Sequence, residues 1–174
     1  MVGGGLSLGS FGKSMLAPPY LAAIWDGGWL RSESIALPSA TSDHTLIESY
    51  VGSPQFHVSF ISSMSGSDIH GPFIGAQIVA ADFVEFYDDA LEDYLGQLLY
   101  SSEWDSPASA EQFATVLRLL RQHFEQGQRC YRLRFDETDK GRQHEAGFTF
   151  VVFREFLFLG AIPGQITRLV IGYD

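Results

Sequence analysis

The chain has 174 residues, 45% of them hydrophobic and 14% aromatic, which excludes a disordered protein and allows one domain with a sizeable core. Its formal net charge of −10 excludes a protein that wraps duplex DNA and suits one that meets a basic protein. The single cysteine, Cys130, excludes an internal disulfide, and no second thiol or histidine stands at ligand spacing to predict a metal site.

The charge is unevenly distributed along the chain. Residues 1–117 hold 2 basic and 14 acidic side chains, whereas residues 118–174 hold 9 basic and 7 acidic ones. Nine of the eleven cations are arginines, which favour fixed ion pairs over general solubility.

The first 19 residues read as a glycine-rich leader, and residues 20–174 are expected to form one α+β domain. Met1–Ser14 has neither the basic nor the long apolar region of a secretory signal, and no apolar run reaches membrane-spanning length, so a cytoplasmic protein is expected. Gly5–Gly9 matches G-x-S-x-G, and Ser7–Ser14 approaches a Walker A loop. Neither has the preceding strand that these motifs need, so no catalytic or nucleotide site is predicted there.

Two hairpins are predicted next. Tyr20–Trp25 and Trp29–Leu37 have strand composition and flank an Asp-Gly-Gly turn. Thr45–Val51 and Gln55–Ser62 flank Gly-Ser-Pro and suggest a second pair of strands.

The loop after the second hairpin holds a small group of candidate catalytic residues. Asp68 could orient His70 as a base, although Asp and Ser are also ordinary loop residues. His44, His57 and His70 are evenly spaced but match no metal-binding motif, so no metal site is predicted.

The stretch Asp82–Trp104 predicts a helix after the largely apolar segment Pro72–Ala81. Asp82 and Glu85 stand at capping-box spacing, and apolar residues then recur at helical spacing. The opposite helix face carries five carboxylates and no cation: Glu85, Asp88, Asp89, Glu92 and Asp93. Such a face is either solvated or a docking surface for a cationic partner, and acids near a helix N-terminus also favour the helix dipole.

A second helix is predicted from Ser109, because Gln112 follows at capping-box spacing and Gly127 suits the helix end. Its short connection to the acidic helix predicts an αα-hairpin.

Three further strands are predicted toward the C-terminus: Arg129–Asp136, Phe148–Phe158 and Ile166–Tyr173. In the first, strict alternation places Arg132 and Arg134 on one face, where they could grip a phosphate or carboxylate.

Strand signals therefore cluster before and after two helices. This order predicts an α+β fold with a mainly antiparallel sheet and a central two-helix hairpin packed on one face. A Rossmann-like α/β alternation is the weaker alternative, because no glycine-rich loop joins a strand to a helix.

Two function classes remain open, besides that of a structural or assembly subunit. The first is an acidic cytoplasmic binding or inhibitor protein, of the immunity or antitoxin type, that docks a basic protein through Glu85, Asp88, Asp89, Glu92 and Asp93. The second is a small enzyme or anion-binding module using Arg132, Arg134, Asp68 and His70. Neither class requires a cofactor, a nucleic acid or a membrane.

Overall fold

The computed structural model describes residues 20–25, 28–58, 60, 68–100, 108–136, 138–145 and 152–173 of the chain. The glycine-rich leader, with its two motif look-alikes, lies outside the described residues. Six strands form one sheet in the order β1-β2-β8-β7-β6-β5. Their bounds are β1 Tyr20–Trp25, β2 Gly28–Ala36, β5 Phe83–Phe86, β6 Arg129–Leu133, β7 Val152–Leu159 and β8 Gln165–Tyr173.

Every neighbouring pair in this sheet is antiparallel, so the predicted α+β class is confirmed and the Rossmann-like alternative is wrong. The first predicted hairpin is present as β1 and β2. The last two predicted strands form the hairpin of β7 and β8. The turn of that hairpin contains Gly164 at φ +71°, where a Cβ would lie 2.8 Å from the carbonyl oxygen of Leu37. Only glycine fits such a position without strain.

The predicted second hairpin is wrong, because its first strand is the helix α1, Asp43–Val51. The Ser42 side chain accepts a hydrogen bond from the Thr45 N–H at 3.2 Å, which caps the helix start. Leu46, Ile47 and Tyr50 then fall on one buried face. Capping and packing thus outweigh the β-forming composition of the segment. The described part of Gln55–Ser62 is turn and irregular chain rather than strand.

The predicted acidic helix is also shorter than expected. Asp82 ends a 3₁₀ turn, η2 Ala80–Asp82, and its carboxylate accepts from the Val79 N–H at 2.9 Å instead of capping a following helix. The chain then forms β5 and the 3₁₀ turn η3, Asp88–Ala90, and only afterwards the helix α2, Leu91–Leu99. Pairing with β6 satisfies one side of the β5 backbone, and Phe83 is buried in the core. Residues 101–107 lie outside the described residues.

The second helix is α3, Ala110–Glu125, and its predicted capping box is confirmed. The Ser109 N–H donates to Gln112 Oε1 at 2.7 Å, and the Gln112 N–H donates to Ser109 Oγ at 3.2 Å. Gly127 follows the helix at φ +73°, as expected for a residue in the left-handed region.

The segment around Pro72–Ala81 forms short strands and 3₁₀ turns. β3 Ile69–His70 pairs with β4 Phe73–Ile74, and the 3₁₀ turn η1, Gly75–Gln77, follows. A further 3₁₀ turn, η4 Lys140–Arg142, contacts this region. The Arg142 guanidinium donates a hydrogen bond to the Gln77 carbonyl oxygen at 2.8 Å.

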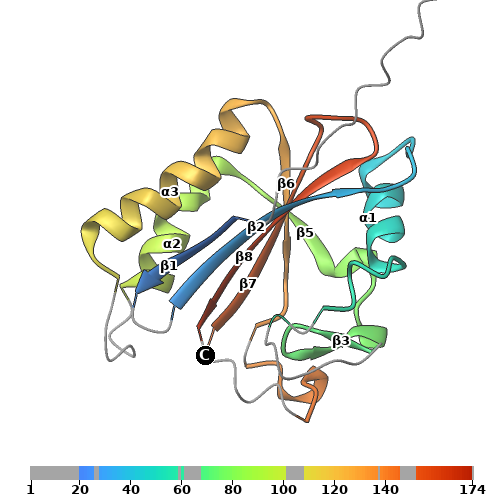
Figure 1. Ribbon diagram of the computed structural model, residues 1–174, viewed down its shortest axis with the longest axis horizontal. Coiled ribbons are helices and arrows are strands. Elements are labelled where there is room, and N and C mark those ends of the chain that lie inside the picture. Colours follow the sequence, from blue (N-terminus) through green and yellow to red (C-terminus); the bar gives the residue numbers. More distant parts are fainter. Residues whose placement is uncertain are drawn as a thin grey trace, which may run out of the picture.

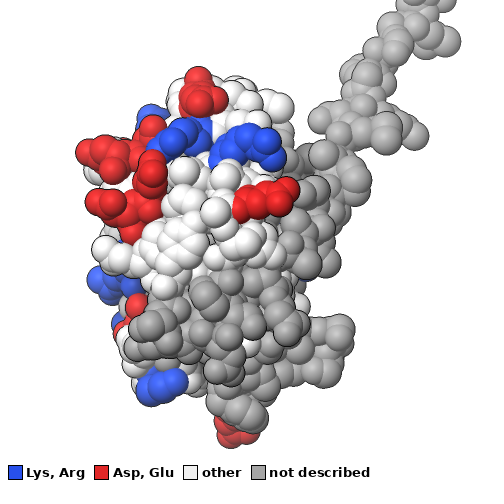
Figure 2. Space-filling model, turned by 90° about the vertical axis from the view of Figure 1, so that its left-hand side faces the viewer, with Lys and Arg blue, Asp and Glu red and all other residues white. Residues whose placement is uncertain are grey.

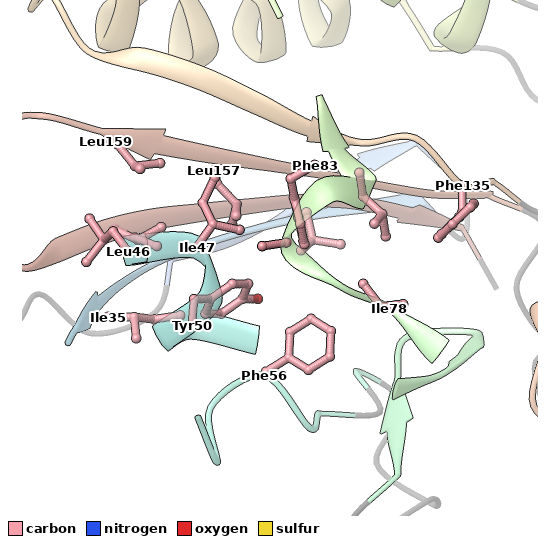
Figure 3. Close-up of a cluster of buried hydrophobic side chains, with 14 of the residues drawn as sticks. Ile35, Leu46, Ile47, Tyr50, Phe56, Ile78, Phe83, Phe135, Leu157 and Leu159 are labelled. Carbon is pink, nitrogen blue, oxygen red and sulfur yellow. The ribbon is translucent and has the colours of Figure 1, made fainter. Parts of the chain in front are cut away.

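Helices cover both faces of the sheet, as Figure 1 shows with α2 and α3 on one side and α1 on the other. The α2 and α3 helices pack against each other, so the predicted helix pair on one face is confirmed, and α1 is an additional helix. Alternate residues of β7 face the two cores: Phe156 and Phe158 point toward α2 and α3, whereas Leu157 and Leu159 point toward α1. Figure 3 shows the second of these cores, with Leu46 and Ile47 against the sheet.

Candidate functional site

The acidic surface consists of Glu85, Asp88, Asp89, Glu92 and Asp93. All five residues are exposed to solvent. They do not share one helix face: the first lies on β5, the next two in η3 and the last two in the first turn of α2. Figure 2 shows Asp and Glu side chains gathered on one side of the helical face of the molecule, with Lys or Arg side chains beside them.

One arginine from the neighbouring helix reduces this charge. Arg121 of α3 lies 3.5 Å from Asp88 Oδ1 and 3.3 Å from Glu92 Oε2. These exposed pairs add little stability. Five carboxylates and one guanidinium leave the acidic surface with a net charge of −4.

Two exposed residues with apolar groups are chain neighbours of these carboxylates. Tyr87 is 59% exposed and Val84 is 38% exposed. The Tyr87 hydroxyl donates to Glu85 Oε2 at 2.6 Å, and this hydrogen bond raises the pKa of Tyr87. A tyrosine ring held beside carboxylates resembles the aromatic anchors of protein interfaces.

The two arginines predicted as an anion grip are already engaged. The Arg132 guanidinium lies 4.9 Å from the centre of the Tyr94 ring and donates to its hydroxyl at 3.4 Å. Arg134 lies just beyond β6, where it contacts the buried carboxylate of Asp82 at 2.6 Å.

Asp68 does not orient His70. Its carboxylate instead accepts from the Ala76 N–H at 2.8 Å. His70 is fully buried on the α1 side of the sheet, whereas Arg132 packs against α2 on the opposite side. The four residues of the predicted anion-binding group therefore do not meet.

His70 instead belongs to a buried polar band that sequence reasoning missed. The band crosses three adjacent strands and consists of Arg31 and Glu33 on β2, Arg168 on β8, Glu155 on β7, Tyr50 on α1 and His70 on β3. The sequence signal was charged residues inside largely apolar strands, as Arg154 and Glu155 are in β7 and Arg168 is in β8. Such residues are almost never fully buried unless they are paired.

The centre of the band is the hydrogen-bonded pair of His70 and Glu155. His70 Nδ1 lies 2.6 Å from the carbonyl oxygen of Phe56, so this nitrogen must carry hydrogen. His70 Nε2 lies 2.5 Å from Glu155 Oε2, and a nitrogen lone pair cannot face a carboxylate that closely without a proton between them. Tyr50 completes the group by donating its hydroxyl hydrogen to Glu155 Oε1 at 2.6 Å. Burial, followed by the Glu155 charge, raises the pKa of Tyr50.

The outer half of the band is an ion-pair chain. Arg168, which is 2% exposed, donates from NH1 to the Tyr50 hydroxyl and to the Gln55 carbonyl, both at 2.9 Å. Its NH2 group forms an ion pair with Glu33. The other oxygen of Glu33 accepts from Arg31 at 3.1 Å. Burial, followed by the nearby Arg31 charge, lowers the pKa of Arg168 to about 9.

Two cavities lined by described residues bear on binding. The larger one, of about 560 Å³, lies at the N-terminus of α1. Its charged groups already satisfy one another, because Asp43 accepts from Arg129 at 2.5 Å and from the Tyr131 hydroxyl at 2.8 Å. The smaller one, of about 250 Å³, reaches the outer half of the polar band.

Within the described residues, no group of three or more His, Cys, Asp or Glu side chains is arranged to hold a metal ion. His44 lies on α1, where it is exposed and pairs with Glu48 at 3.6 Å, whereas His70 is fully buried. No helix in the described part of the chain is both long enough and apolar enough to cross a membrane.

No protein-family model, no curated protein and no solved structure matches the chain.

Proposed function

We propose that the chain is a cytoplasmic binding protein, of the inhibitor or immunity type, that docks a basic protein through the acidic surface. The observation that carries this proposal is the set of five exposed carboxylates on β5, η3 and the first turn of α2, with exposed Tyr87 hydrogen-bonded to Glu85 and Arg121 as their one described ion-pair partner. A surface with this charge speeds encounter with a cationic partner, and the ring of Tyr87 can then anchor the complex.

The position of β5 adds support, because it is an edge strand of the sheet. The Arg134 N–H donates to the Asp82 carbonyl at 3.0 Å, which places this residue pair in the hydrogen-bonded register. Antiparallel alternation then directs the N–H and C=O of Glu85 away from β6, toward the side on which no described strand pairs with β5. A partner could therefore add main-chain hydrogen bonds to the electrostatic contact.

Arg132 and Arg134 give the alternative of an anion-binding module little support, because Arg134 is paired with Asp82 and Arg132 packs on Tyr94, although Arg132 Nε has no described acceptor. Support for anion binding comes from a different pair of arginines, Arg31 and Arg168, which line the smaller cavity.

The test uses the double variant Asp89→Asn/Asp93→Asn, which removes two charges without touching the ion pairs of Arg121. The matched control is Glu111→Gln/Glu125→Gln, which removes the same charge from exposed positions on α3. A basic protein captured from native lysate by the wild type and the control, but not by the double variant, is the expected partner.

Association rates with that protein should then be measured at low and high salt. The double variant should associate more slowly, and the difference should shrink with salt because the Debye length is about 10 Å at 0.1 M. Equal rates for the double variant and the control at both salt concentrations would refute the docking surface.

A further inference from the structure

The smaller cavity combines two guanidinium groups with an apolar wall. The described residues that line it are Arg31, Glu33, Ser34, Ile35, Ala36, Gln55, Val58 and Arg168. Its volume of about 250 Å³ is below the roughly 300–1,000 Å³ of sites for drug-sized ligands. A ligand here would therefore have only a few non-hydrogen atoms.

Both arginines at this cavity have an N–H group without an acceptor, and Glu33 Oε1, although in ion-pair contact with Arg168, also has no hydrogen bond. The Nε–H groups of Arg31 and Arg168 are buried, and neither has an acceptor in the described structure. A buried donor without an acceptor is rare and unfavourable, and it is more so for a charged group. Because arginine has no acceptor atoms, an acceptor-rich ligand is the chemical complement of this pair.

The charges at the cavity are also unbalanced. Arg31 and Arg168 both contact the same carboxylate, Glu33, so two positive charges share one negative charge. Glu155, the nearest further carboxylate of the band, is held by His70 and Tyr50 instead. One additional negative charge would balance the pair of guanidinium groups and reduce their mutual repulsion.

We infer that this cavity binds a small aliphatic carboxylate. Its carboxylate group lies between the guanidinium groups of Arg31 and Arg168, in the planar geometry that arginine favours for this ligand. Its short apolar chain lies against Ile35 and Val58 on the wall of the cavity. This site is separate from the acidic surface and does not depend on the proposed protein partner.

The test is titration of the full chain with acetate, butyrate and inorganic phosphate, with chloride at equal ionic strength as the reference. Amide chemical shifts report the site, and butyrate should shift the amides of residues 31–36 and bind more tightly than acetate. Arg31→Met keeps the aliphatic stem but removes one guanidinium, and it should weaken butyrate binding at least about tenfold. Arg129→Met, at the other cavity, is the matched arginine control and should bind butyrate as the wild type does.

A second variant keeps both charges intact. Val58→Leu extends the apolar wall by one methylene and should weaken butyrate more than acetate, because only the longer acid reaches the wall. Binding of butyrate no tighter than chloride would overturn the inference. So would equal affinity for phosphate and butyrate, or an Arg31→Met variant that binds butyrate as tightly as Arg129→Met does.

Discussion

The polar band makes a sharp prediction for Tyr50→Phe, which removes one hydroxyl and leaves the ring in place. Tyr50 is fully buried, and its hydroxyl donates to Glu155 and accepts from Arg168. After the change, Arg168 NH1 keeps the Gln55 carbonyl as an acceptor at 2.9 Å. Glu155 Oε1 keeps no other described donor, although Oε2 keeps His70.

The expected loss of stability is therefore that of leaving one buried carboxylate oxygen without its hydrogen-bond donor. Hydrogen bonds to charged groups contribute about 1.5–3 kcal/mol, so the free energy of unfolding should fall by roughly 2–3 kcal/mol. For a chain of this size, that loss lowers Tm by about 4–12 °C.

The matched control is Tyr131→Phe, which also removes a hydroxyl bonded to a carboxylate. Asp43, the acceptor of that hydroxyl, keeps Arg129 at 2.5 Å and is reached by solvent. This change should cost less than about 1 kcal/mol. Urea unfolding followed by circular dichroism gives both values, provided that the m-value is unchanged. If Tyr50→Phe cost no more than Tyr131→Phe, the band would not be the tightly coupled network described above.

Two further predictions concern single elements. Burial, followed by the hydrogen bond to Asp43, raises the pKa of Tyr131 to about 12. Between pH 10 and about 12 the unfolded chain loses this phenolic proton while the folded chain keeps it, so the free energy of unfolding should fall as pH rises. Unfolding measured across that range should show a shallower fall in Tyr131→Phe than in the wild type. Leu133→Ala should cost about 2–5 kcal/mol because Leu133 is 1% exposed in the core. Arg134→Ala should cost about 1–3 kcal/mol, more than an ordinary surface arginine, because it leaves the buried Asp82 carboxylate without its cation. Equal unfolding free energies for Arg134→Ala and the wild type would show that this ion pair contributes nothing.

Local signals in the sequence were sufficient for much of the fold. The capping box at Ser109 and Gln112 begins α3 as predicted, and the alternation in Arg129–Asp136 places Leu133 in the core. These signals act over two to four residues, through hydrogen bonds and side-chain periodicity that neighbouring residues supply themselves. The antiparallel sheet and the helix pair followed from them.

The same kind of signal misled where distant packing competed with it. Asp82 and Glu85 have the spacing of a capping box, yet pairing with β6 makes the intervening segment a strand. Thr45–Val51 has strand composition, yet the Ser42 cap and burial of one face make it a helix. Tertiary contacts of this kind outweigh intrinsic preferences of less than about 1 kcal/mol per residue.

No local signal in the sequence could predict the polar band. Tyr50 and Glu155 are 105 residues apart, and Tyr50 and Arg168 are 118 residues apart. Arg121 likewise meets the acidic surface only because α3 packs on α2. The sequence alone determined the acidic character of the chain, the β1–β2 hairpin and the cap of α3, because those depend on composition and near neighbours. The tertiary structure alone decided which buried charges meet, because a charged side chain inside a strand is tolerated only when folding brings its partner to it.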